Sequence, residues 1–171
     1  MKNRISGLTL VELMVMLAVV AILIAVGVPN LRNIISGNRL TTQINQLSNH
    51  LAYARSEAVT RSKRVGLMSA GGANWEAGWT VWVDDNGDRV MDAGEERLRV
   101  AEAMPANIAL TNDTGSATIV YDADGTAVET QAAAVAFTLC NNADKAVPGR
   151  ELTINVTGRP ELTKTDVDCG S

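Results

Sequence analysis

The densest group of side chains that could do chemistry lies in one acidic stretch between two β-rich runs. Five oxygen-bearing side chains here fall at ligand positions of a calcium-binding EF-hand loop: Asp84, Asn86, Asp88, Asp92 and Glu95. The position where that loop needs a glycine for its sharp turn holds Arg89, and strands rather than helices are expected on either side. A solvated hairpin turn rich in Asp and Asn therefore fits better, and calcium is the minor hypothesis.

No catalytic set emerges from the sequence. His50 is the only histidine, and it lies in a polar, helical stretch where a solvated or helix-packing role fits best. Neither a G-x-S-x-G nucleophile pattern nor a phosphate-binding P-loop is present. Because no nucleophile, base or proton-transfer group comes with a partner, we expect a protein that is not an enzyme and needs no cofactor.

One carboxylate, Glu12, interrupts an otherwise apolar run from Leu8 to Val28. A helix of that length spans roughly 30 Å, the thickness of a bilayer's hydrocarbon core. The basic residues Lys2 and Arg4 precede the run and favour an N-terminus in the cytoplasm. A plain signal anchor is the alternative, but an acid in lipid costs up to a few kcal/mol and has no use there.

The N-terminal residues resemble a known leader. Gly7 followed by Leu8-Thr9-Leu10-Val11-Glu12 is similar to the class III leader of type IV pilins and type II secretion pseudopilins. The resemblance implies that a prepilin peptidase cleaves between Gly7 and Leu8 and methylates the new amine of Leu8, where the family more often has Phe. It also implies that Glu12 pairs with the N-terminal amine of a neighbouring subunit, which would neutralise the acid only when subunits dock in register.

Later stretches extend this resemblance to the GspH/FimT/FimU group of minor pilins and pseudopilins. Residues 75–84, followed by the acidic turn, look like that group's first hairpin, and residues 121–126 look like its aromatic-to-glycine turn. The resemblance implies a minor pilin held first in the inner membrane with its C-terminal domain in the periplasm. Its expected partners are the prepilin peptidase and other major and minor pilins. A type II secretion pseudopilin is the alternative.

The periodicity of the chain predicts an α+β fold with a long N-terminal helix packed on an antiparallel β-sheet domain. The helix is expected from about Leu8 to Arg61, with a break near Pro29 because proline removes a backbone donor. Its second half carries an apolar stripe at spacings of three and four: Leu40, Ile44, Leu47, Leu51, Ala54 and Ala58. The expected parts are a leader (1–7), a transmembrane or polymerisation helix (8–29), an amphipathic continuation (30–64) and a β domain (65–171).

From Val65 onward the period changes to two, and turn signals separate short β-rich runs. The expected strands are residues 64–68, 78–83, 96–100, 108–110, 118–121, 134–139 and 151–156. Cys140 and Cys169 lie late in a chain that would be delivered to an oxidising compartment, so a disulfide is expected. Two free buried thiols are the alternative.

Nucleic-acid binding is a less favoured hypothesis. The net charge of −4 gives no bulk attraction to DNA. FimT-type proteins have a C-terminal Gly-Arg-x-Arg loop linked to DNA capture, whereas here Glu161 stands in the place of the second arginine. Candidate DNA contacts are Arg150, Arg159 and Lys164, for which a structural or subunit-contact role fits better. The tryptophans that could stack bases, Trp75, Trp79 and Trp82, fit a strand core or subunit interface better.

Overall fold

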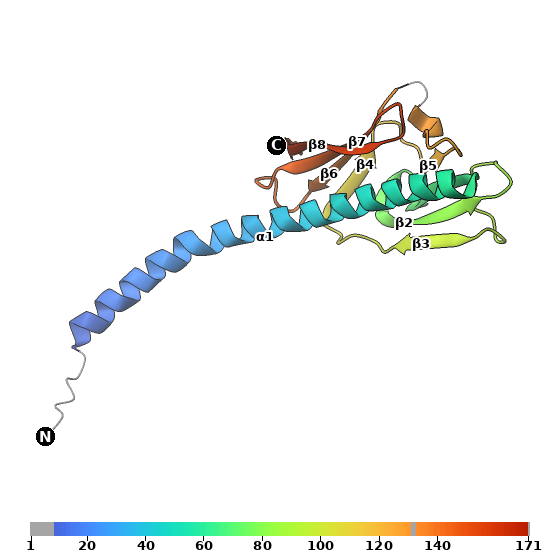
Figure 1. The fold of residues 1–171 in the computed structure, drawn as a ribbon. Coiled ribbons are helices and arrows are strands. Elements are labelled where there is room, and N and C mark those ends of the chain that lie inside the picture. The colour runs from blue at the N-terminus through green and yellow to red at the C-terminus, as the bar shows by residue number, and fades with distance from the viewer. Residues whose placement is uncertain (1–8, 131–132, 171) are drawn as a thin grey trace, which may run out of the picture. The chain divides into compact units, whose positions relative to one another are not determined.

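The computed structural model describes residues 9–130 and 133–170. It contains a long helix, α1 (Leu10–Arg61), followed by strands and a short 3-10 helix (Figure 1). The strands are β1 (Arg64–Gly71), β2 (Asn74–Asp84), β3 (Arg97–Ala101), β4 (Ile108–Asn112), β5 (Thr118–Tyr121), β6 (Val135–Asn141), β7 (Gly149–Ile154) and β8 (Pro160–Val167). The 3-10 helix η1 covers Val128–Thr130. The α+β class expected from the sequence is confirmed.

Helix α1 runs without interruption, so the expected break near Pro29 is wrong. Proline removes one hydrogen bond, the one its missing N–H would make to the carbonyl of Ala25. That loss is confined to one turn, and the turns on either side keep their own bonds. The chain divides into two compact units, Met1–Ser36 and Gly37–Ser171, with the boundary inside α1.

Residues 9–130 and 133–170 contain no helix that combines the length and the apolar character needed to cross a membrane. The span expected over residues 8–29 is therefore not confirmed.

Within Gly37–Ser171, the second half of α1 packs through the stripe that the periodicity predicted. All six stripe residues, from Leu40 to Ala58, are fully buried. The helix ends in a Schellman motif: Ser62 has a φ of 52°, the Lys63 N–H donates to the Ala58 carbonyl, and the Ser62 N–H donates to the Val59 carbonyl. This end turns the chain directly into β1.

The strands form two antiparallel four-stranded sheets, in the orders β3-β2-β1-β5 and β4-β6-β7-β8. The seven strands expected from the sequence are all present within a few residues of their predicted bounds. Their division into two sheets was not predicted, and β8 was missed. The six residues from Glu161 to Asp166 on β8 are all exposed, so the strand has no alternation of apolar and polar side chains to reveal it.

Aromatic side chains join the two sheets to each other and to α1. Trp75 on β2 meets Phe137 on β6 edge to face, with 5.0 Å between ring centroids. The Trp75 Nε1–H donates to the carbonyl of Ser116, and the Trp79 Nε1–H donates to Nδ1 of His50 on α1. Trp75, Trp79 and Trp82 are all buried, so the prediction of a core role for them is confirmed.

Candidate functional site

The N-terminal turn of α1 positions Glu12 at the third residue of the helix. Its backbone N–H donates to the side-chain oxygen of Thr9 at 3.3 Å, which makes Thr9 the N-cap. A carboxylate in the first turn is also favoured by the helix dipole. The sequence reasoning missed this cap, in which the Thr9 side chain accepts the Glu12 N–H, although the Thr-x-x-Glu spacing could have revealed it. Gly7 and Leu8, the expected cleavage site, lie outside the described residues.

Apolar side chains are exposed along the part of α1 that lies in the first compact unit. The large ones extend from Leu10, which is 76% exposed, to Ile35, which is 45% exposed, and they point to several sides of the helix. A soluble domain rarely leaves so much contiguous apolar surface uncovered, and such surfaces mark interaction sites. In the described part of this segment, Glu12 and Arg32 are the only charged residues.

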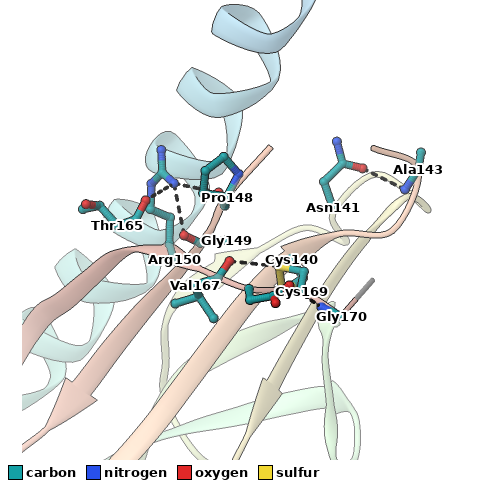
Figure 2. The surroundings of a disulfide bond; sticks show 11 residues. Cys140, Asn141, Ala143, Pro148, Gly149, Arg150, Thr165, Val167, Cys169 and Gly170 are labelled. Atoms are coloured by element: carbon teal, nitrogen blue, oxygen red, sulfur yellow. Dashed lines mark hydrogen bonds between the residues drawn. A yellow bond between two sulfur atoms is a disulfide. The ribbon is translucent and has the colours of Figure 1, made fainter. Parts of the chain in front are cut away.

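The three candidate DNA-contact residues have different surroundings. Arg150 is half-buried, and its guanidinium donates to the carbonyls of Pro148, Gly149 and Thr165 (Figure 2) and to the Thr41 hydroxyl on α1. Arg150 therefore ties β7, β8 and the helix together.

Lys164 and Arg159, the other two candidate DNA contacts, differ from Arg150 in their surroundings. Lys164 forms an ion pair with Glu151 at 3.0 Å. Arg159 is exposed and lines a groove of about 490 Å³ that Arg55 of α1 also lines. The structure thus does not bring the three residues together as one cationic surface.

Cys140 and Cys169 form the expected disulfide (Figure 2), which joins β6 to the segment after β8. Gly149 on β7 is packed against it: a β-carbon at that position would lie 2.5 Å from the Cys169 sulfur and 3.1 Å from the Cys140 sulfur. The disulfide and this close approach hold the last residues of the chain against the second sheet.

The acidic stretch folds as a turn in which the carboxylates accept hydrogen bonds from N–H groups of the same turn. Asp84 accepts from the N–H groups of Gly87 and Arg89, and the Asn86 amide donates to Asp88 and Asp92. The carboxylate of Glu95 accepts two further backbone N–H groups, those of Asp85 and Asp92. Among the described residues, no group of three or more acidic, cysteine or histidine side chains has a metal-binding arrangement.

His50 is a packing residue, as its sequence context suggested. Its Nδ1 accepts the Trp79 indole hydrogen at 3.0 Å, which requires an unprotonated nitrogen there. Burial lowers the pKa of His50, and the nearby Arg99 guanidinium lowers it further. No acid–base partner accompanies it in these contacts.

Two glutamates that the sequence did not single out bond to N–H groups of edge strands. The Glu129 carboxylate accepts the Val120 N–H of β5 at 2.8 Å, and burial raises the pKa of Glu129. The Glu76 carboxylate accepts the Leu110 N–H of β4 at 3.4 Å. Both bonds join residues that are distant in the sequence or lie across a turn, so no local pattern could have revealed them.

Comparison with known sequences gives a family and a relative. The family described as "Type II transport protein GspH" matches residues 43–158. A relative, the pilin-like protein PilA1 of Thermus thermophilus, is 36% identical over 92 residues. That alignment covers 53% of this chain and 55% of PilA1, so the chain spans about half the length of this relative.

Comparison with solved structures gives the same fold. The type IV minor pilin FimU of Pseudomonas aeruginosa superposes with a TM-score of 0.62 at 24% identity, covering 75% of this chain and 90% of FimU. The minor pseudopilin EpsH of the Vibrio cholerae type 2 secretion system superposes with a TM-score of 0.50 at 10% identity, covering 72% of this chain and 94% of EpsH. At these identities the likeness concerns the fold alone.

Proposed function

This chain belongs to the GspH family of type IV minor pilins and pseudopilins, and on that premise we propose that it is a non-catalytic minor pilin that takes part in type IV pilus assembly. A prepilin peptidase would cleave after Gly7 and methylate Leu8. The mature helix would then join a filament of other pilins, where the subunit primes or caps the tip. Before assembly, residues 8–29 would be held in the inner membrane with the β domain in the periplasm.

The observation that carries this proposal is the uncovered apolar surface of α1 between Leu10 and Ile35, with one acid near its start. Neighbouring helices of the same kind would cover that surface once it leaves the bilayer, because apolar area left in water costs about 25 cal/mol per Å². Glu12 would then find its counter-charge in the N-terminal amine of a neighbour. A charge that is neutralised only in the docked state selects the register of docking.

Substitution of Gly7 tests the processing step. Gly7→Leu places a bulky side chain at the proposed cleavage position, and we expect an uncut precursor that is absent from sheared filaments. Asn3→Leu, within the same leader but away from the cleaved bond, is the matched control and should be processed normally. Mature protein of normal size in the filaments of the Gly7→Leu strain would overturn the proposal.

The second candidate function is DNA capture at a filament tip, and the observation that favours it is the groove that Arg55 and Arg159 both line. A mobility-shift series of the full chain in detergent with duplex DNA, across salt concentrations, tests it. Binding that weakens with salt and is lost in Arg159→Ala would support DNA capture. No shift at low salt would reject it. A role in type II secretion is distinguished by which partner pilins co-purify.

A further inference from the structure

Four strands lie at the edges of the two sheets, and two of these edges are closed by the chain itself. Beside β5, Ala127 makes an isolated bridge to Tyr121, and Glu129 accepts the Val120 N–H. Beside β4, Glu76 accepts the Leu110 N–H. An edge strand otherwise presents a row of unpaired N–H and C=O groups to any extended chain that approaches.

The two remaining edges, β8 and β3, differ in what surrounds them. β8 begins with Pro160 and alternates acidic and basic side chains, Glu161, Lys164 and Asp166, which are features that protect an edge from pairing. β3 runs beside α1 and has a groove on that side. Thr42, Asn45, Gln46, Asn49 and His50 of α1 line this groove together with Arg99 of β3, and its volume is about 450 Å³.

The groove continues along α1 toward the N-terminus of the helix. Thr42 is shared with a second hollow of about 350 Å³, which Arg39 of α1 and Pro105 also line. From Arg39 to His50 the helix rises by roughly 16 Å at about 1.5 Å per residue. An extended segment of about five residues has the same length, and β3 itself has five residues.

Two positive charges line this path. Arg39 and Arg99 are exposed and neither forms an ion pair within the described residues. The nearby Glu96 is paired with Arg61 at 2.6 Å. Arg99 stacks over the Tyr53 ring, with 3.7 Å from its guanidinium carbon to the ring centroid, so its position is fixed on the groove side of the strand. Arg97 pairs with Trp82 in the ladder and so lies on the opposite face.

We propose that the β3 edge and its groove bind an extended acidic segment of a partner protein as an added strand. The backbone of that segment would continue the sheet beyond β3, which is the β-augmentation mode of peptide recognition. Its alternate side chains would point into the groove, where carboxylates would meet Arg39 and Arg99 and the amides would supply further hydrogen bonds. The same arginines repel a second copy of β3, so the charge selects a different chain. This surface does not depend on the exposed first half of α1 or on the proposed function.

A peptide-binding experiment with the full chain in non-ionic detergent tests this. The probe is a fluorescein-labelled peptide of about six residues, roughly 20 Å long, with alternating Glu and Val. We expect saturable binding by fluorescence anisotropy and slower hydrogen exchange of the β3 amides when the probe is added. Two control probes separate the contribution of charge from that of backbone hydrogen bonds. One has Lys in place of Glu, and the other keeps the charges but has N-methylated amides along one edge.

Charge-reversal variants locate the site. Arg99→Glu and Arg39→Glu should each weaken binding at least about tenfold, roughly 1.4 kcal/mol. Arg159→Glu reverses another exposed arginine, which lies outside the groove and forms no ion pair with residues 9–130 or 133–170, and it should leave binding unchanged apart from a small general effect of charge. Retained β3 exchange rates in the free variants would show that the strand is intact.

Four results with the probes and variants, and a fifth without any probe, would each overturn the proposal. The four are no saturable binding, equal binding of the Lys probe, equal loss in Arg159→Glu, and equal binding of the N-methylated probe with displacement of both by inorganic phosphate. The last would mean a simple anion patch. Concentration-dependent dimers of the full chain that protect β3 without any probe would equally overturn it, because a second copy would then be the occupant.

Discussion

At the scale of single residues, one close contact within the first sheet leaves no room for a side chain at residue 66. Gly66 on β1 lies directly under the Trp82 indole, and a β-carbon there would approach the ring atoms to between 2.4 and 2.9 Å. Trp82 is fully buried and cannot swing out into solvent. The absence of a side chain at residue 66 is therefore a packing requirement of the first sheet.

Gly66→Ala is expected to lower the free energy of unfolding by about 1–3 kcal/mol, because the added methyl group overpacks the ring. Gly94→Ala is the matched control: a β-carbon there meets nothing within 4 Å, so its stability should stay within about 0.5 kcal/mol. Denaturant unfolding followed by tryptophan fluorescence measures both. Equal stability of the two variants would contradict this packing.

The bond between His50 and Trp79 predicts a dependence of stability on pH. The pKa of His50 is lowered in the folded state, chiefly by burial and then by Arg99, so the folded protein binds a proton less readily than the unfolded chain. The stabilisation is present above the unfolded pKa, about 6.5, and is lost as the pH falls below it toward the lowered folded pKa.

His50→Gln separates this effect from other titrations, since a glutamine oxygen accepts the indole hydrogen without titrating. We expect the unfolding free energy of the parent to fall more than that of the variant between pH 7.5 and pH 5. Unfolding curves at the two pH values supply the comparison. A parallel fall in both proteins would show that His50 is not the titrating group.

At the scale of elements, sequence periodicity predicted the features that depend on residues close together in the chain. The apolar stripe of α1 follows from helical spacing alone, and all six of its residues are buried. The partition of strands into two sheets depends on pairings between distant residues, and β8 has polar side chains on both faces, so neither followed from periodicity. The bond from Arg150 to Thr41 spans 109 residues, so no sequence pattern indicated that this candidate DNA contact is a structural tie.

At this scale, removal of the disulfide has a defined effect on the free energy of unfolding. The cysteines are 29 residues apart, and closing such a loop stabilises by roughly 3–4 kcal/mol on the loop-entropy model. Cys140→Ser with Cys169→Ser should lose about that much unfolding free energy, and the β8 amides should exchange faster. Reducing agent should destabilise the parent and leave the double variant unaffected. A parent whose unfolding midpoint ignores reduction would contradict this.

At the scale of the whole molecule, one helix serves two compact units with different surfaces. Its second half is covered by sheets that close around a shared core. Its first half exposes apolar side chains that nothing in the described chain covers. The sequence identified that half through its composition and through Glu12, and the structure adds that the Thr9 side chain caps the Glu12 N–H.

The most direct measurement of the central claim is the amount of protein in sheared filaments of the native host when Glu12 is changed to Gln. Gln at this position keeps the Thr-x-x-Gln capping pattern and the size of the side chain but removes the charge. Met16→Leu, one turn further along the same exposed helix, is the control because it keeps the apolar area and volume of the side chain. Recovery of Glu12→Gln should fall at least about tenfold, equivalent to roughly 1.4 kcal/mol of docking energy, while Met16→Leu assembles normally. Filaments that contain Glu12→Gln at the parental level would contradict a docking role for this carboxylate.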